Sequence, residues 1–242
     1  MKINKDAYGQ EIMEYLKTGK SFEIVERSDG FISPSSGPKN YFANFNNWNF
    51  YERKAISNAK GKILDVGAGA GRISLYLQKK GFDVTAIDNS PLAISVCRKR
   101  GVKKAKVLPI GDISKLSPNK FDTVVMLGNN FGLFGGFHKA KKLLKTLYKI
   151  TAPRALILAE SNNPYKTKDP NHRSYHKLNL KHGRMAGQLR IRIRFYKTIG
   201  DWFDYLLVSP HEMKTILDGT GWRIRKVISS EKSSYIALIE KV

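Results

Sequence analysis

The feature that most constrains the fold is the segment 62–72, in which a short apolar run leads into a glycine-rich turn and then an amphipathic stretch. The apolar run, residues 63–66, has the length of a buried strand. Gly67, Gly69 and Gly71 follow at alternate positions, where the missing Cβ lets the backbone turn sharply and approach a ligand. A strand, a glycine turn and a helix in this order predict a nucleotide-binding unit of an α/β protein.

Two acidic residues accompany this turn. Asp65 stands two residues before the first glycine, and Asp88 follows a second expected strand, residues 83–87, about 20 residues downstream. The Asp88 carboxylate could accept hydrogen bonds from both hydroxyls of a ribose. A dinucleotide site would have its third glycine one residue later, where this chain has Arg72. The sequence therefore departs from the dehydrogenase pattern.

The segment Asp65-Val-Gly-Ala-Gly-Ala-Gly71 resembles the first motif of the class I S-adenosylmethionine-dependent methyltransferases, an acidic residue followed by G-x-G-x-G. The resemblance implies that the turn holds the methionine half of S-adenosyl-L-methionine and that Asp88 holds its ribose. It also implies that Asp112 accepts the adenine amino group while the amide of Ile113 meets a ring nitrogen. A dehydrogenase or a structural turn is the alternative interpretation of the glycines, and a solvated turn that of Asp112.

The rest of the chain fits the same interpretation. Two strands near the end of the chain, 222–229 and 235–240, are separated by so few residues that only an antiparallel hairpin can join them. We therefore expect an α/β fold, a doubly wound, Rossmann-like sheet of seven mostly parallel strands with a final antiparallel strand. The other expected elements are strands at 62–66, 83–87, 105–108, 121–127 and 154–160 and helices at 139–150 and 210–217.

Two segments lie outside this core. Residues 1–60 form an N-terminal helical and aromatic extension, and residues 161–209 interrupt the step between the fifth strand and the next helix. We expect the extension to act as a lid and the insert as a substrate cap on a methyltransferase domain spanning 61–242. A lid would exclude water and align the reacting atoms. The extension is expected to contain a helix at 6–17, a loop at 28–38 and a helix at 47–60.

Aromatic side chains are dense in the extension, and Tyr41 and Trp48 are predicted to contact the cofactor, since aromatic faces suit a sulfonium cation. A small satellite core under a loop is the alternative. The remaining predicted cofactor contacts are Ala68, Asn89, Leu127, Gly128 and Asn129.

A strictly alternating stretch in the insert, 188–197, places Arg190, Arg192 and Arg194 on one side of a strand. The following strand, 202–208, is expected to pair with it as a hairpin. Three arginines on one side could clamp a carboxylate or phosphate of the substrate. Solvated arginines paired with Asp201 or Asp204 are the alternative.

Candidates for proton removal from the acceptor are His172, Tyr175 and His176, which fall close together in the insert. They lack a convincing metal-ligand spacing, and no metal is expected. Asn130, after the fourth strand, and Tyr165, after the fifth, are predicted substrate contacts.

The amino-acid composition limits where the protein can function and which partners it can bind. The chain has one cysteine, Cys97, which can form no internal disulfide and is expected to pack in the core, with a nucleophilic role as the alternative. No apolar run approaches the length of a membrane span, so we expect a cytoplasmic protein without a membrane partner. The formal net charge of +23 would attract polyanions, although lysine-rich surfaces also occur for stability.

These observations predict an enzyme that transfers a methyl group by in-line displacement to a nitrogen or oxygen of a small, anionic or aromatic acceptor. The alternatives are an RNA methyltransferase that uses the basic surface, and a catalytically inactive scaffold that binds the cofactor. The sequence contains no recognisable RNA-binding module.

Overall fold

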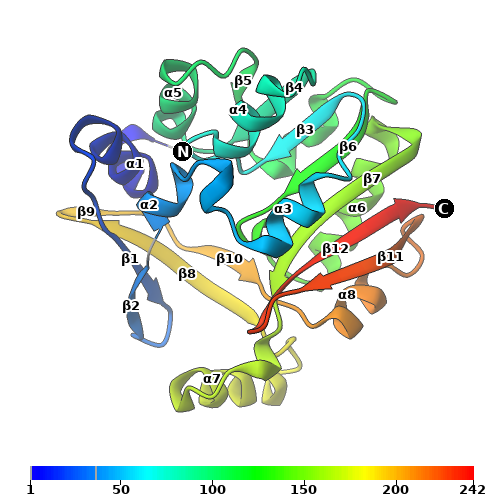
Figure 1. Cartoon of the computed structure of the whole chain (residues 1–242). Coiled ribbons are helices and arrows are strands. Elements are labelled where there is room, and N and C mark those ends of the chain that lie inside the picture. The colour runs from blue at the N-terminus through cyan, green and yellow to red at the C-terminus, as the bar shows by residue number, and fades with distance from the viewer. Residues whose placement is uncertain (1, 36) are drawn as a thin grey trace. The chain divides into compact units, whose positions relative to one another are not determined.

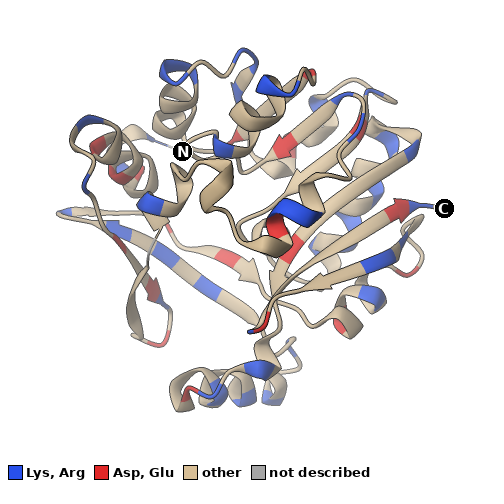
Figure 2. Ribbon diagram, in the orientation of Figure 1, with Lys and Arg blue, Asp and Glu red and all other residues tan. Residues whose placement is uncertain are grey.

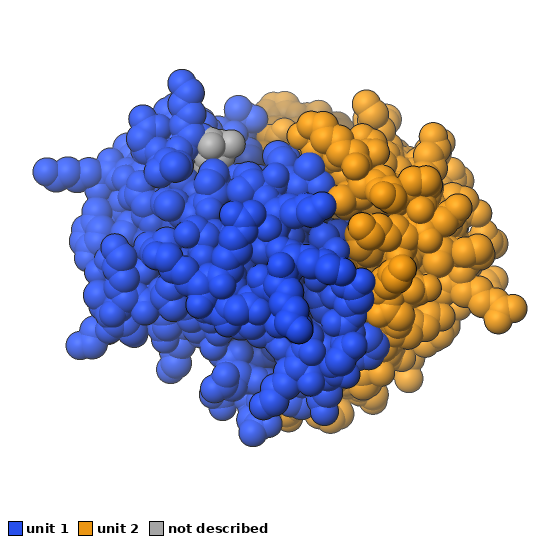
Figure 3. All heavy atoms as spheres, turned by 90° about the horizontal axis from the view of Figure 1, so that it is seen from above, with its two compact units in different colours: residues 1–48, 64–110, 190–203 blue, residues 49–63, 111–189, 204–242 orange. Residues whose placement is uncertain are grey.

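A computed structural model of the chain describes residues 2–35 and 37–242 (Figure 1). Met1 and Ser36 lie outside the described residues. Both fall in the predicted extension, and Ser36 also falls in the predicted loop. The chain forms two compact units (Figure 3). The first unit comprises residues 1–48, 64–110 and 190–203, and the second comprises 49–63, 111–189 and 204–242. Residues of the predicted insert therefore belong to both units.

The larger sheet has seven strands in the order β11-β12-β7-β6-β3-β4-β5. The pairs β4–β5 and β6–β7 are parallel, whereas β12 pairs antiparallel with both β7 and β11. This confirms the predicted fold class. Its strands are β3 (Ile63–Val66), β4 (Val84–Asp88), β5 (Ala105–Val107), β6 (Phe121–Met126), β7 (Thr151–Asn162), β11 (Trp222–Ser229) and β12 (Ser234–Lys241).

Helices alternate with these strands, and several begin at recognisable caps. The hydroxyl of Ser90 caps α5 by accepting a hydrogen bond from the backbone N–H of Ala93, and Ser209 and Glu212 form a capping box at the start of α8. The α-helices are α1 (Ala7–Thr18), α2 (Gly37–Tyr41), α3 (Phe50–Ile56), α4 (Arg72–Lys79), α5 (Pro91–Lys99), α6 (Phe137–Ile150), α7 (Pro170–Lys181) and α8 (Pro210–Leu217). The 3₁₀ helices are η1 (Ile3–Lys5), η2 (Phe45–Asn47), η3 (Ile110–Lys115), η4 (Asn130–Phe134) and η5 (Pro164–Lys166).

Helix α6 shows why the periodic segments were predictable. Its buried side chains recur at three- and four-residue spacing along one face, and each buried leucine contributes about 1.5–3 kcal/mol. The predicted helix at 47–60 is shorter in the structure, because α3 ends at Ile56. The buried face of α6 consists of Ala140, Leu143, Leu144, Leu147 and Ile150.

A second sheet has the order β10-β8-β1-β2, with the short β9 (Thr198–Ile199) also paired to β8. Its other strands are β1 (Glu23–Arg27), β2 (Ile32–Ser35), β8 (Gln188–Phe195) and β10 (Phe203–Leu206). The predicted pairing of the two insert strands is confirmed, since β8 and β10 are neighbours. In addition, β8 pairs antiparallel with β1, which the sequence did not indicate.

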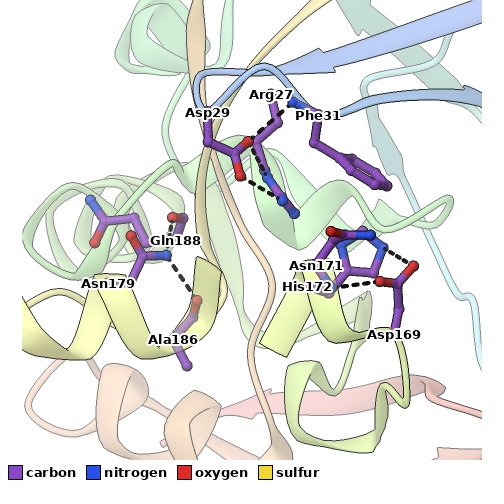
Figure 4. Close-up of polar contacts among 9 residues, drawn as sticks. All are labelled: Arg27, Asp29, Phe31, Asp169, Asn171, His172, Asn179, Ala186 and Gln188. Atoms are coloured by element: carbon purple, nitrogen blue, oxygen red, sulfur yellow. Dashed lines mark hydrogen bonds and ion pairs between the residues drawn. The ribbon is translucent and has the colours of Figure 1, made fainter. Parts of the chain in front are cut away.

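The predicted loop at 28–38 is wrong, because β2 lies within it. A tight turn joins β1 to β2: the Arg27 guanidinium donates two hydrogen bonds of 2.8 Å to Asp29, and Gly30 has a φ of +87° (Figure 4). Pro34 is tolerated because β2 lies at the edge of its sheet. Among the described residues, no helix has the length and apolar character needed to cross a membrane.

Candidate functional site

The glycine turn after β3 adopts a backbone that only glycine accommodates freely. Gly67, Gly69 and Gly71 have φ values of +72°, +54° and +81°. A Cβ built on Gly69 would lie 2.6 Å from the hydroxyl oxygen of Tyr8, and one on Gly71 would lie 2.8 Å from a methyl group of Val102. Both positions therefore combine left-handed backbone with close neighbours. The structure requires glycine at both.

The amides of this turn are largely used within the protein. The N–H groups of Gly67 and Ala68 both donate to the carbonyl of Ile87, at 2.9 and 3.1 Å, and that of Gly71 donates to the carbonyl of Ala68. The N–H of Gly69 donates to Asp88 Oδ2 at 2.9 Å. The turn therefore offers a ligand its shape and its bare Cα atoms rather than a row of free amide donors.

Asp88 stands at the end of β4 and is only 6% exposed. Its Oδ2 accepts from Gly69 and its Oδ1 accepts from the backbone N–H of Ser90 at 2.9 Å. Burial raises the pKa of Asp88 to about 6, while the bonds from Ser90 and Gly69 lower it. Because each carboxylate oxygen can accept a second hydrogen bond, this fixed carboxylate can still receive two hydroxyl groups.

Asp65, near the end of β3, is held by the helix that follows the turn. The Ser74 hydroxyl of α4 donates to Asp65 Oδ2 at 2.6 Å. Burial raises the pKa of Asp65 to about 6, against the lowering effects of the Ser74 bond and the Arg72 charge. Asp65 thus links β3 to α4 across the turn, and its side chain orients the turn. Sequence reasoning named Asp65 but missed Ser74.

The N-terminal segment is anchored to the same region by Asp6, the cap of α1. The Asp6 carboxylate accepts hydrogen bonds from Gly9 N, Ser90 Oγ and Leu92 N, at 2.9, 2.7 and 3.1 Å. It is completely buried. These bonds join α1 to the start of α5, and Tyr8 consequently reaches the glycine turn. The only sequence signal for Asp6 was an aspartate at a helix start.

Tyr41 and Trp48 lie in the same unit as the turn, with different surroundings. The Tyr41 hydroxyl donates to Glu23 Oε2 at 3.2 Å, and its ring meets that of Tyr8 edge-on at 5.5 Å. Trp48 is buried, and its indole N–H donates to the carbonyl of Ala43 at 2.9 Å. The satellite-core interpretation accounts for these Trp48 contacts, and a cofactor role for either residue stays a prediction.

Cys97 is fully buried on α5, and its thiol donates to the carbonyl of Gly69 at 3.1 Å. Burial raises the pKa of this thiol well above its usual range. A protonated, enclosed thiol is a poor nucleophile. The contact that Cys97 makes is its hydrogen bond to the backbone of the glycine turn.

In the second unit, the chain leaves β6 through Leu127 and Gly128, both predicted cofactor contacts. The N–H of Gly128 donates to Glu160 Oε2 at 2.6 Å, and the Tyr51 hydroxyl donates to Glu160 Oε1 at 3.2 Å. Glu160 is 4% exposed and was missed by sequence reasoning. A charged residue inside the apolar strand β7 was the available signal.

Asn129 has a left-handed backbone with a φ of +63°, and its carbonyl accepts a hydrogen bond of 2.6 Å from the Tyr205 hydroxyl. Its side-chain Oδ1 is buried and accepts no hydrogen bond within the part of the chain that the structure describes. Asn130, a predicted substrate contact, begins η4 directly afterwards. The β6 end therefore presents one unused hydrogen-bond acceptor.

Three other predicted cofactor residues have varied environments. Asp112 lies in η3 and forms an exposed ion pair of 3.1 Å with Lys115, which the solvated interpretation also accommodates. Ile113 is fully buried, and Asn89, after β4, is exposed. Their contacts with a nucleoside stay predictions.

The predicted catalytic residues His172, Tyr175 and His176 all lie on α7. His172 Nε2 lies 3.9 Å from the carboxylate of Asp169, which caps the same helix (Figure 4). Tyr175 is buried. Their part in proton removal stays a prediction.

Tyr165, in η5, is 55% exposed, and its hydroxyl donates to Glu212 Oε1 at 2.8 Å. Burial and then Glu212 raise the pKa of Tyr165 to about 12. A hydroxyl that already donates to a carboxylate remains available to a substrate only as an acceptor.

The arginines of β8 have a partner that was not foreseen. Glu26 of β1 receives two hydrogen bonds from Arg192, at 2.8 and 2.9 Å, and one of 3.2 Å from Arg194. These bonds lower the pKa of Glu26. Arg190 lies two residues earlier on the same strand. Pairing of β8 with β1 therefore gives Arg192 and Arg194 a structural role, and binding of a substrate anion by the three arginines stays a prediction.

Basic residues are spread along the chain rather than gathered in one segment. Figure 2 shows lysine and arginine on α5, α7 and β8 among other elements. On α6 the lysines at positions 139, 142, 145 and 149 are exposed, as is usual for a solvated helix face.

Comparison with known proteins identifies the fold and its core. Residues 63–154 match the model of a family described as a methyltransferase domain. The structure resembles that of a SAM-dependent methyltransferase from Bacteroides fragilis in complex with S-adenosyl-L-homocysteine, with a TM-score of 0.84 and 26% identity over 100% of this chain and 97% of that one.

Curated relatives match over shorter stretches. A ubiquinone biosynthesis O-methyltransferase of Xylella fastidiosa is 33% identical over 82 residues, which are 32% of this chain and 33% of the relative. A tRNA (uracil(54)-C(5))-methyltransferase of Pyrococcus horikoshii is 31% identical over 104 residues, 42% of this chain and 24% of the relative. The chain spans less than half the length of the curated relatives it matches.

Proposed function

Because this chain belongs to the class I S-adenosylmethionine-dependent methyltransferase family, we propose that it transfers a methyl group from S-adenosyl-L-methionine to a nitrogen or oxygen of a small acceptor. When bound, this cofactor supplies a methyl carbon on a cationic sulfur. The chain's own residues bind the cofactor, orient it and keep water from the reacting atoms.

The observation that carries this proposal is the bond between Asp88 and Gly69. It fixes a buried carboxylate beside a glycine turn in which Gly69 lies against the hydroxyl of Tyr8. Such a carboxylate fits a ribose diol, since each oxygen has one acceptor position left after the bonds from Gly69 and Ser90. The amino-acid tail of the nucleoside is assigned to the glycine turn beside it.

We further propose that the N-terminal segment covers this turn. Asp6 attaches α1 to the start of α5, and Tyr8 of α1 places its hydroxyl next to Gly69. A covering helix would exclude water from a reaction in which alignment of nucleophile, methyl carbon and sulfur supplies much of the rate. The predicted cap formed by residues 161–209 is retained as part of the same proposal.

The acceptor is proposed to be a small molecule rather than RNA. The chain matches relatives named for ubiquinone biosynthesis and for tRNA methylation over similar lengths, so these matches do not separate the two acceptor classes. Arg192 and Arg194 of β8, which were expected to attract an anion, are paired with Glu26. This leaves general surface charge as the argument for RNA.

A labelling experiment tests the proposal. Purified protein is incubated with cell extract and S-adenosylmethionine carrying a labelled methyl group, and the label is followed into small-molecule, RNA and protein fractions. We expect label among the small molecules. Label in the RNA fraction alone would show that the acceptor is RNA and not a small molecule. Label in no fraction would support a cofactor-binding scaffold.

A further inference from the structure

An open pocket of about 280 Å³ lies in the second unit, at the end of the large sheet where β7 begins and β12 ends. Its wall comes from β7, β12 and β11, which are neighbours in the sheet, and from the segment that follows α3 (Figure 1). Along β7, Arg154 of the pocket lies about 20 Å from Glu160. The pocket is therefore separate from the strand ends to which methyl transfer is assigned. Its polar lining residues are Asn58, Lys60, Arg154, Arg225, Glu240 and Lys241.

The positive charge of this pocket exceeds its negative charge. Four lining side chains are cationic, whereas the lining contains one carboxylate, that of Glu240. Glu240 already accepts a hydrogen bond of 2.7 Å from Arg223, which is not part of the lining. Within residues 2–35 and 37–242, none of the four cations forms an ion pair with a carboxylate, and the Arg154 guanidinium donates no hydrogen bond. Positive charge in a concave site attracts anions.

Irregular strand pairing places both arginines at the pocket. In β11 the pairing with β12 shifts between Ile224 and Lys226, which leaves Arg225 as the extra residue of a β-bulge. In β7 the pairing with β6 also shifts, and residues 152–155 stand opposite a single residue of β6. Arg154 lies within this second irregularity. Because bulges redirect side chains, two separate interruptions of the sheet supply guanidinium groups to one pocket.

Neighbouring polar groups orient two of the cations without neutralising them. The Arg225 guanidinium donates a hydrogen bond of 3.4 Å to Asn58 Oδ1. The Lys241 ammonium donates to the carbonyls of Tyr148 and Thr151, at 2.6 and 2.9 Å, which leaves one of its N–H groups for a ligand. These partners are uncharged amide oxygens. The orientation of the cations is therefore set while their charge stays available.

We propose that this pocket binds a compact anion that carries one or two phosphate groups, either a free ion or the ester of a small compound. The planar donor fork of a guanidinium matches phosphate oxygens, and two such forks with two ammonium groups suit several negative charges. A monocarboxylate supplies a single charge and would leave most of the pocket uncompensated. The volume lies at the lower end of the range for small-molecule sites, so the ligand is small. The proposal does not depend on methyl transfer.

The bound anion would connect two parts of the second unit. Lys60 belongs to the segment after α3, whereas the other cations of the pocket lie on strands. The backbone N–H and carbonyl of Lys60 form hydrogen bonds of 2.9 and 2.8 Å with the Thr123 hydroxyl, so the base of its side chain is fixed. A ligand that contacts all these cations binds the folded chain and not the unfolded one. It should therefore stabilise the fold against urea.

Isothermal titration of the full chain with sodium pyrophosphate, at constant ionic strength and without divalent cations, tests the proposal. We expect pyrophosphate to bind at a single site and sodium acetate not to bind. Arg154→Gln and Arg225→Gln should each weaken pyrophosphate binding by about tenfold or more, since each removes charged hydrogen bonds. Arg173→Gln is the matched control, because it removes the same charge from an exposed position on α7 and should leave Kd unchanged. Urea unfolding without the anion checks that the variants fold.

Two results would overturn the proposal. One is the absence of pyrophosphate binding to the unchanged protein. The other is equal weakening by Arg154→Gln and Arg173→Gln, which is the result expected of general surface attraction. Competition then separates the sources of the anion. Displacement of pyrophosphate by fructose 1,6-bisphosphate would identify a phosphorylated small compound, and its failure would identify the free ion. Displacement by a short single-stranded RNA alone would contradict the proposal and assign the pocket to nucleic acid.

Discussion

The glycine turn and the Glu11–Glu23 pair bury the same kind of group in opposite ways. Asp88 accepts two backbone hydrogen bonds and Asp65 accepts one from Ser74, whereas Glu11 accepts none. The pKa values of the two aspartates reach about 6, and that of Glu11 about 12. Hydrogen bonds to the charged form offset desolvation. At neutral pH the Asp88 carboxylate can therefore accept from a neutral diol, whereas protonated Glu11 donates its hydrogen bond to Glu23.

The largest expected effect is at the turn itself. Gly69→Val would put a β-branched residue at a φ of +54° and its Cβ 2.6 Å from the Tyr8 hydroxyl, so nucleoside binding should be lost. Gly81→Val is the matched control, because Gly81 has a φ of +90° and no neighbour within 4 Å of its built Cβ. Calorimetry with S-adenosylhomocysteine should show binding by the control alone. Equal loss in both variants would attribute the effect to backbone strain.

Asp88→Ala should weaken nucleoside binding by about 1.5–3 kcal/mol, or roughly 10- to 150-fold in Kd, since it removes charged acceptors. Asp83→Ala is a control at the other end of the same strand region, where Asp83 forms an exposed ion pair with Lys104. The same titration measures both. An unchanged Kd for Asp88→Ala would contradict the proposed contact between Asp88 and the ribose.

The pH dependence of binding should follow Asp88. Its folded pKa of about 6 lies above the usual value of 3.8, so the carboxylate becomes protonated as the pH falls below about 6 and nucleoside affinity should decline. The stability contribution has the opposite sign: it is fully present below about pH 4 and is lost as the pH rises through 6. Titrations between pH 5 and 8 on the Asp88→Asn variant should lack the decline. A flat profile for the unchanged protein would contradict an ionised Asp88 as the acceptor.

A smaller effect concerns stability at the acid pair. The folded pKa of Glu11 is raised far above its unfolded value, so its stabilising contribution is lost as the pH rises from about 4.5 toward 12. Glu11→Gln should therefore unfold at higher urea concentration than the unchanged protein, with a difference that grows by at most about 1.4 kcal/mol per pH unit. Urea unfolding at several pH values measures it. Parallel pH profiles for the two proteins would show that Glu11 is not the buried acid responsible.

The sequence predicted those helices and strands whose hydrophobic periodicity or glycine spacing is visible over a few neighbouring residues. The turn after β3, helix α8 and strand β11 were located from periodicity and glycine spacing, because each carries its own signal along a few residues. Strand β2 was missed because a stretch with Ser, Gly and Pro becomes a strand only through pairing with β1. Tertiary pairing there overrides local preference.

The sequence predicted the acidic residues of the candidate site but not the residues that form hydrogen bonds with buried acids. Asp65 and Asp88 were named from their spacing to the glycines. The hydrogen bonds from Ser90 to Asp6 and from Tyr51 to Glu160, however, join residues 84 and 109 positions apart. No local spacing encodes such contacts. Glu11 was overlooked for a related reason, since a glutamate on an amphipathic helix normally lies in solvent and only the packing of α1 buries it.

The central claim is that the turn at Gly69 and the carboxylate of Asp88 together hold the nucleoside. A crystal structure of the protein with S-adenosylhomocysteine tests this most directly. We predict both ribose hydroxyls within about 3 Å of the Asp88 oxygens and the amino-acid tail along the glycine turn. Nucleoside density at another place, with Asp88 still bonded only to Gly69 and Ser90, would contradict it.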